Sequence, residues 1–203
     1  MINEQIAEQI GDSTGLNFRQ RWASYLTIFV AVIGLGSGVF LRNRSLNATV
    51  HFENRQEGIA VNYPSNWLLE EATGDFVFRV QNPASLPFKT TLQISLLTVG
   101  PGARTSDIPD LLNMTRAATL PAYSPLAITP TTLPNGMAGI QMEYAYVSTE
   151  TNPFLQTVPI VVRARDVIVL RTNQVVVITY RADSQSFDDN LHFFDSFLRT
   201  LEL

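Results

Sequence analysis

The side chains that most often carry chemistry in proteins are sparse in this chain, and their spacing matches no catalytic or metal-binding motif. The two histidines, His51 and His192, are far apart, and neither belongs to an HxxxH or HExxH pattern. They therefore predict no zinc or haem site. We interpret His51 as part of a strand that follows an apolar segment, and His192 as a surface or half-buried packing residue of the last helix.

Carboxylates and serines give no stronger signal. A Ser-His-Asp arrangement would need His192, Asp188 and a serine, but no Gly-x-Ser-x-Gly turn supports it. The pairs Glu70-Glu71 and Asp188-Asp189 are adjacent in sequence, so in regular structure their carboxylates diverge toward solvent. No phosphate-binding glycine loop is present. The sequence thus predicts no catalytic residue, no metal ligand and no cofactor, and a protein that is not an enzyme.

The composition narrows the function classes further. The chain has no cysteine, which excludes disulfides, thiolate nucleophiles, Fe–S clusters and cysteine-type zinc sites. Its formal net charge is −4, and four of its 14 basic residues flank one apolar segment, so the rest of the chain is acidic. This argues against nucleic acid as a partner. The small basic segment Arg163-Ala164-Arg165 is interpreted either as a docking contact or as a solubilising hairpin feature.

The apolar segment, residues 22–41 (WASYLTIFVAVIGLGSGVFL), contains no charged residue and no proline. As an α-helix it would measure about 30 Å, enough to cross the hydrocarbon core of a bilayer. It is longer than the apolar region of a secretory signal, and its few polar side chains form no stripe like that of a core helix. We predict an uncleaved transmembrane helix.

Both ends of this helix suit a membrane interface. Aromatic residues with a polar tip favour the headgroup zone, and arginine side chains extend toward phosphates. The predicted membrane-interface residues are Arg19, Arg21, Trp22, Tyr25, Arg42 and Arg44.

Small residues cluster near the end of the helix. Gly34 and Gly38 are four residues apart, a spacing that lets a second helix approach closely in lipid. Glycine is also common in membrane helices in general, so composition alone remains an alternative. We predict that the helix-packing residues are Gly34, Gly36, Ser37 and Gly38.

Arginine counts at the two ends of the helix are nearly equal, so the positive-inside rule gives little guidance. A short leader followed by a long domain is typical of a signal anchor. We therefore expect a bacterial cytoplasmic-membrane protein with its N-terminus in the cytoplasm and its C-terminal domain on the periplasmic side. In the leader, Ile2, Ile6 and Ile10 share one helical face, and the leader is either a frayed tail or docked on a neighbouring subunit.

Four segments follow from these observations: a cytoplasmic leader over 1–21, a transmembrane helix over 22–41, a juxtamembrane connector over 42–57 and an extracytoplasmic domain over 58–203. Alternating apolar residues predict strands in the domain, and a proline-rich stretch over 121–134 predicts an extended loop with an edge strand. Helices are predicted from Ser106, as a cap, through 118 and over 186–203. The fold class is α+β, with a mainly antiparallel sheet covered by helices. The predicted strands are 58–63, 67–71, 76–80, 89–99, 139–147, 158–170 (with a bend at 163–166) and 174–180.

Two patterns in the domain resemble one family. Gly58 to Trp67 has the form Gly-Ile-x-Val-x-Tyr-Pro-x-x-Trp, and a strand ending Tyr180-Arg181-Ala182 precedes Phe187 and a helix ending Ser196-Phe197. Both are similar to PsbP-like domains. The resemblance implies an α/β/α sandwich, the fold of the extrinsic PsbP protein of the oxygen-evolving complex. The chain departs from that family in having a spanning helix in place of a cleaved signal or a lipobox cysteine.

The resemblance and the apolar helix together predict a non-catalytic, single-pass accessory subunit of a bacterial membrane electron-transfer complex. A quinol-oxidising alternative complex III or a photosynthetic complex is the specific expectation. Its partners would be other subunits of that complex and the lipid bilayer, with no nucleic acid. The alternative is a stand-alone, membrane-anchored module that binds a small ligand or a peptide.

Overall fold

The computed structural model describes residues 18–46, 48–100, 102, 104–149, 158–172 and 174–203, without the side chains of 19–21 and 43–46. The chain divides into two units, residues 1–47 and 48–203, which are treated separately below. The leader, with Ile2, Ile6 and Ile10, lies outside the described residues.

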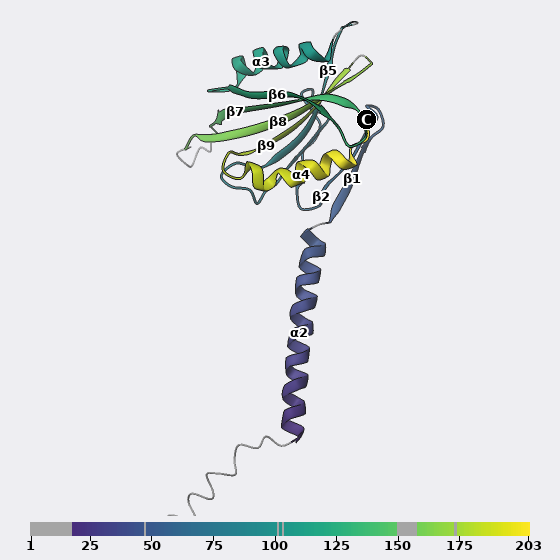
Figure 1. Ribbon diagram of the computed structural model, residues 1–203, viewed down its shortest axis with the longest axis vertical. Helices are drawn as coiled ribbons and strands as arrows, with labels where there is room; N and C mark the ends of the chain where they lie inside the picture. Colours follow the sequence, from purple (N-terminus) through teal and green to yellow (C-terminus); the bar gives the residue numbers. More distant parts are fainter. Residues whose placement is uncertain (1–17, 47, 101, 103, 150–157, 173) are drawn as a thin grey trace, which may run out of the picture. The chain divides into compact units, whose positions relative to one another are not determined.

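The described part of the first unit is a long helix, α2 (Phe18–Leu46), of 29 residues (Figure 1). It includes the predicted apolar segment and extends it at both ends. Residues Trp22–Arg42 have a mean hydropathy of 2.0, and none of this span is buried within the chain. The helix is therefore long and apolar enough to cross a bilayer.

The second unit begins with a two-stranded hairpin, β1 (Thr49–Asn54) and β2 (Ile59–Pro64), paired in antiparallel fashion. The sequence analysis assigned residues 42–57 to a connector, yet β1 lies within that range and the folded unit starts at residue 48. The reason is packing, because the Phe52 ring on β1 lies 4.8 Å from the ring of buried Phe78. A single aromatic residue in a polar strand did not reveal this contact.

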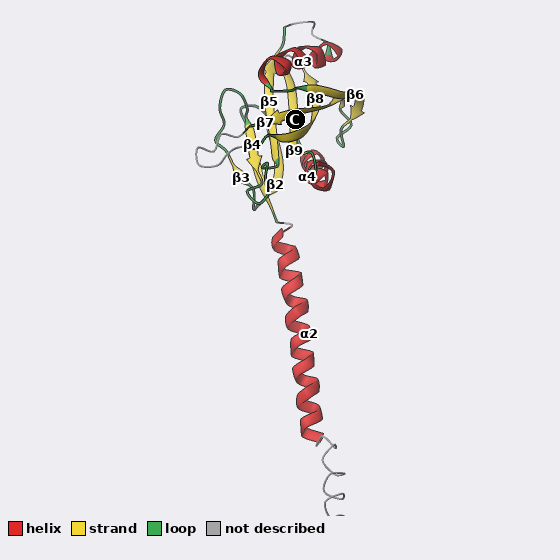
Figure 2. Cartoon of the chain, turned by 90° about the vertical axis from the view of Figure 1, so that its left-hand side faces the viewer, coloured by secondary structure: helices red, strands yellow, loops and turns green. Residues whose placement is uncertain are grey.

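The main sheet has seven antiparallel strands in the order β3-β4-β5-β9-β8-β7-β6. Its two edge strands, β3 and β6, lie on opposite sides of the domain (Figure 2). The strands are β3 (Leu68–Leu69), β4 (Phe78–Gln81), β5 (Thr91–Thr98), β6 (Ser124–Thr132), β7 (Ala138–Ser148), β8 (Ile160–Arg171) and β9 (Gln174–Asp183).

Two helices cover opposite faces of this sheet (Figure 1). Helix α3 (Ile108–Thr119) covers one face, and α4 (Phe187–Thr200) covers the other, together with β2. The predicted apolar face of α4 is confirmed: the side chains of Phe187, Phe194 and Phe197 are each at most 1% exposed. Strands with helices on both faces form the α+β sandwich expected from the sequence.

The edge strand expected within the proline-rich stretch is present as β6, where Pro125 and Pro130 are tolerated because no ladder hydrogen bond is needed. Local details differ from the sequence-based expectations at two other places. Strand β8 has no bend at 163–166, since its register with both neighbouring strands is continuous there. Ser106 does not cap α3; a short 3₁₀ turn, Thr105–Asp107, precedes the helix instead.

The aromatic contacts under α4 predict a large effect of a core truncation. Phe197 lies 5.5 Å from the Phe78 ring and is 1% exposed, so Phe197→Ala should cost about 3–5 kcal/mol of unfolding free energy. His192→Ala, on the exposed side of the same helix, should change stability by no more than about 0.5 kcal/mol. Urea denaturation of the full chain in detergent measures both. Equal losses would contradict this account of the core.

Candidate functional site

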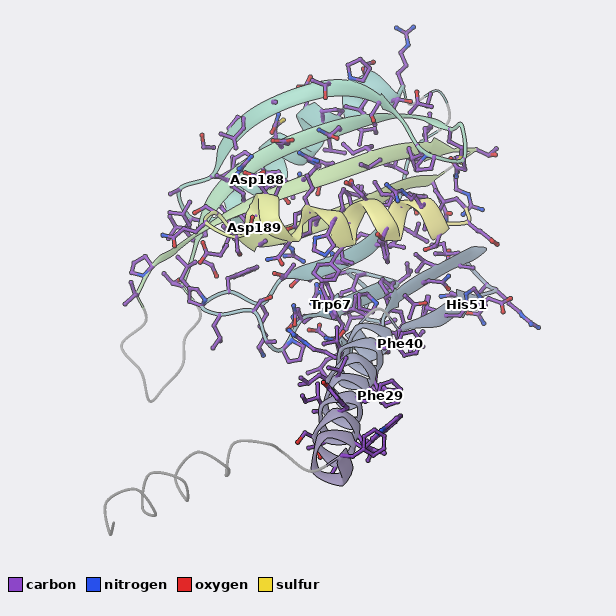
Figure 3. All side chains as sticks on the ribbon, turned by 60° about the horizontal axis from the view of Figure 1, so that its bottom comes forward. Phe29, Phe40, His51, Trp67, Asp188 and Asp189 are labelled. Atoms are coloured by element: carbon purple, nitrogen blue, oxygen red, sulfur yellow. The ribbon has the colours of Figure 1, made fainter. Side chains whose placement is uncertain are left out.

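The two histidines lie on separate elements and form no site together. Figure 3 labels His51. His51 is exposed on β1, where its Nδ1 is 2.8 Å from Oδ1 of Asn62. His192 is exposed on α4, with Nδ1 2.8 Å from the Asp189 carbonyl oxygen. The interpretations of His51 as a strand residue and His192 as a surface residue are both confirmed.

The adjacent carboxylate pairs also remain apart from any catalytic arrangement. Glu70 pairs with Arg79 at 3.1 Å, whereas Glu71 is exposed. Asp188, with a 76% exposed side chain, lies 3.2 Å from Arg163 at the start of α4. Across the part of the chain that the structure describes, no three His, Asp or Glu side chains cluster in a way that suits a metal ion.

The Arg163-Ala164-Arg165 segment is not a free basic spot. It lies within β8, and Glu143 on the neighbouring strand β7 contacts both arginines, at 3.6 Å and 2.7 Å. The Arg163 guanidinium also lies 4.3 Å from the Phe187 ring centroid. The segment is therefore neither an exposed docking contact nor a hairpin tip. The sequence did not show this because Glu143 reaches the arginines only through strand pairing.

Among the described ion pairs, one contains a fully buried carboxylate. It joins Asp166 of β8 to Arg116 of α3. Asp166 is 0% exposed, and the Arg116 guanidinium lies 4.3 Å from the centroid of the Tyr144 ring. Burial raises the pKa of Asp166, while the positive charge of Arg116 opposes that shift. Burial likewise raises the pKa of Tyr144 well above its ordinary value.

This cluster holds a helix in place. Tyr123, which follows α3, donates a hydrogen bond to Asn113 Oδ1 of that helix, and the Tyr123 ring lies 5.5 Å from Tyr144. These contacts and the ion pair tie α3 to the sheet face beneath it. Sequence reasoning missed Asp166, because an aspartate after Arg163-Ala164-Arg165 looked like part of an exposed bend. The signal available in the sequence was that Asp166 occupies a position where the alternation of β8 places buried residues.

The predicted helix-packing residues all lie within helix α2. A Cβ added at any of the three glycines would meet nothing within 4 Å, so this surface is uncovered by the described chain. At about 100° per residue, Gly34, Ser37 and Gly38 share one side of the helix, whereas Gly36 lies nearly opposite. The sequence analysis grouped Gly36 with the other three, and the helical period separates it from them.

The predicted interface residues are only partly described. Trp22 and Tyr25 are 60% and 68% exposed, and Arg42 is exposed as well. Arg19, Arg21 and Arg44 lie in the helix, but their side chains are outside the described part. Their contact with lipid stays a prediction.

A shallow hollow of about 290 Å³ is formed by the β1–β2 turn together with Glu202 and Leu203. Another, of about 280 Å³, lies between β6 and α4 and combines Leu133 and Val167 with the exposed side chains of Asp195 and Arg199. Neither contains a buried titratable group.

Comparison with known proteins identifies the fold. No protein-family model and no curated protein sequence matches this chain. Among solved structures, cyanobacterial PsbP (CyanoP) from Synechocystis sp. PCC 6803 is similar with a TM-score of 0.55 at 10% identity, covering 77% of this chain and 92% of that protein. LpqN, involved in cell envelope biogenesis of Mycobacterium tuberculosis, gives 0.52 at 14%, covering 77% and 91%. PA94 from Pseudomonas aeruginosa, of unknown function, gives 0.51 at 14%, covering 77% and 98%. The domain has the PsbP-like fold, as the sequence resemblance implied.

The buried ion pair predicts a strong and asymmetric response to mutation. Asp166→Asn leaves the Arg116 charge buried without its partner, which should cost about 3–5 kcal/mol of unfolding free energy. Asp188→Asn removes only an exposed pair and should cost less than about 1 kcal/mol. Replacing both Asp166 and Arg116 by leucine should cost less than Asp166→Asn alone. Urea titrations compare the three variants, and a double variant that is the least stable would contradict the assignment.

Proposed function

We propose that this chain, with its PsbP-like domain, is a non-catalytic, single-pass accessory subunit of a bacterial membrane complex. Helix α2 anchors it and packs against helices of neighbouring subunits, and the domain docks on the extracytoplasmic side. The observation that carries the proposal is the unburied apolar span Trp22–Arg42, joined to a folded domain of its own. An exposed apolar surface of this length is stable only in lipid or against another protein.

The helix-packing face is the part of α2 most suited to protein contact. Gly34, Ser37 and Gly38 leave the backbone accessible along one side, and small residues at this spacing let a second helix approach closely. The rest of the span carries large apolar side chains that suit lipid, among them Phe29 and Phe40 (Figure 3).

For the orientation, we propose an N-terminus in the cytoplasm and a domain on the periplasmic side, as for a signal anchor. Because the chain has no cysteine, single cysteines at exposed positions report the topology directly. Met114→Cys on α3, at a position 73% exposed, should react with a membrane-impermeant maleimide in intact spheroplasts. Labelling only after lysis would contradict this orientation.

The proposed host is an electron-transfer assembly, either a quinol-oxidising alternative complex III or a photosynthetic complex. The support is the likeness of the domain to cyanobacterial PsbP, together with the membrane span.

The alternative function is a stand-alone anchored binding module. The hollow between β6 and α4 favours it, because this hollow combines an apolar floor at Leu133 and Val167 with the opposite charges of Asp195 and Arg199. Thermal-shift measurements on the full chain with zwitterionic metabolites, such as amino acids, test this. A ligand that stabilises the chain and loses its effect in Arg199→Ala would favour the module.

The packing face yields a direct test of the accessory role. In Gly34→Leu/Gly38→Leu, the two leucines should block close helix approach, so the chain should be lost from its assembly. Gly36→Leu, on the opposite side of α2, is the matched control and should leave assembly unchanged. Blue-native electrophoresis after mild solubilisation measures the assembly. A wild-type chain that migrates without other subunits would contradict the proposed function.

A further inference from the structure

Among the described sheet edges in the domain, the outer side of β1 is the one best suited to accept a further strand. In the seven-stranded sheet, β3 is only two residues long and β6 carries Pro125 and Pro130, and both features discourage strand addition. In the hairpin, the free side of β2 is covered, because Ala60 exchanges backbone hydrogen bonds with Glu202, and the Asn62 N–H donates to the Thr200 hydroxyl. The outer side of β1 has no such cover.

The hydrogen-bonding pattern identifies the open groups on β1. The Ser65 N–H donates to the Ala48 carbonyl, so in this register Val50, Phe52 and Asn54 point their backbone groups toward β2. The outward bonds of Ala60 and Asn62 on β2 agree with this alternation. The N–H and C=O groups of Thr49, His51 and Glu53 therefore point away from the hairpin. No described residue bonds to these six groups, and all three residues are exposed.

We propose that β1, which carries the labelled residue His51 (Figure 3), pairs in antiparallel fashion with β1 of a second copy of this chain, about a two-fold axis at His51. In this register Thr49 of each copy lies opposite Glu53 of the other, and the two His51 residues face each other. All six outward groups of each strand are then paired, which gives six hydrogen bonds across the interface. A register shifted by two residues leaves some of these groups unpaired, and a shift of one residue sets outward groups against inward ones.

The side chains of β1 complement themselves in the same register. On the side of the hairpin that faces the core, Val50 of one copy lies opposite Phe52 of the other. Val50 is 40% exposed in the single chain, and Phe52 is partly buried, so pairing covers an apolar edge. On the outer side, Glu53 of one copy lies beside Thr49 and near His51 of the other, so no two carboxylates lie directly opposite each other. A four-stranded sheet, β2-β1-β1-β2, results.

This inference does not depend on the proposed function or on the glycine face of α2. It uses only the backbone directions in the β1–β2 hairpin, and it makes the partner a copy of the chain itself. The alternative is that an extended segment of another protein pairs with β1. The positions at which two copies of this chain cross-link distinguish the two cases.

Single cysteines in the otherwise cysteine-free full chain test the register in detergent or in lipid nanodiscs. Facing residues in a hydrogen-bonded pair have Cα atoms about 5.5 Å apart, within disulfide range, so His51→Cys should oxidise to a covalent dimer. Thr49→Cys alone and Glu53→Cys alone should not, because equivalent atoms would be about 14 Å apart along the strands. A mixture of the Thr49→Cys and Glu53→Cys chains should cross-link.

A proline at position 51 provides the second test. Because the His51 N–H points outward, His51→Pro should keep the hairpin but remove two of the six interface bonds and obstruct the facing strand. His51→Ala, the matched control, keeps the N–H. Light scattering of the full chain in detergent should give a dimer for the wild type and His51→Ala, and half that protein mass for His51→Pro.

Two results would overturn the proposal. One is a His51→Cys chain that cross-links no better than Thr49→Cys alone. The other is a His51→Pro chain that retains the protein mass of the wild type. A third outcome is that His51→Pro removes the chain from a larger assembly while His51→Cys forms no dimer. In that case a different polypeptide pairs with β1, and the proposal that a second copy of this chain does so is wrong.

Discussion

The apolar side chains of α2 need a non-aqueous environment, and the described chain provides none. The span Trp22–Arg42 is fully unburied, whereas the aromatic residues of α4 find their cover on the main sheet. Water strongly disfavours a helix surface of this kind. The role proposed for the molecule follows from this constraint, because a chain that keeps such a helix would associate with lipid, with neighbouring helices, or with both.

The domain, in contrast, buries its apolar side chains within its own fold. Its core has two parts, one on each face of the main sheet, and each face has its own helix. On one face, aromatic stacking among Tyr180, Phe187 and Phe194 buries the inner side of α4, and the Tyr180 hydroxyl donates to the Phe187 carbonyl at 2.8 Å. On the other face, the Arg116–Asp166 pair fixes α3. Apolar packing thus sets the position of α4, whereas α3 combines apolar contacts at Ile108 and Leu112 with a buried ion pair. The open backbone groups lie at β1.

The sequence revealed the parts of this structure whose signals are local. The apolar span was predicted from an unbroken apolar run long enough to cross a bilayer. The inner face of α4 and the alternating strand β2 were predicted because their apolar residues repeat with the period of a helix and of a strand. Features that depend on pairing between distant segments were missed. Glu143 neutralises Arg163 and Arg165 only because β7 lies beside β8, and Asp166 is buried only because α3 crosses that face. His51 was expected in a strand, but residues 42–57 were assigned to a connector and not to the domain. The contact that joins this strand to the domain is between Phe52 and Phe78, which lies far along the chain.

The central claim, that α2 is retained as a membrane anchor, is tested most directly by mass spectrometry of the chain in carbonate-washed membranes of its native host. The account predicts that the carbonate-resistant fraction holds a chain that still includes residues 22–41. A mature chain that begins after residue 41 and is released into the soluble fraction would contradict it, because the segment would then be a removed signal.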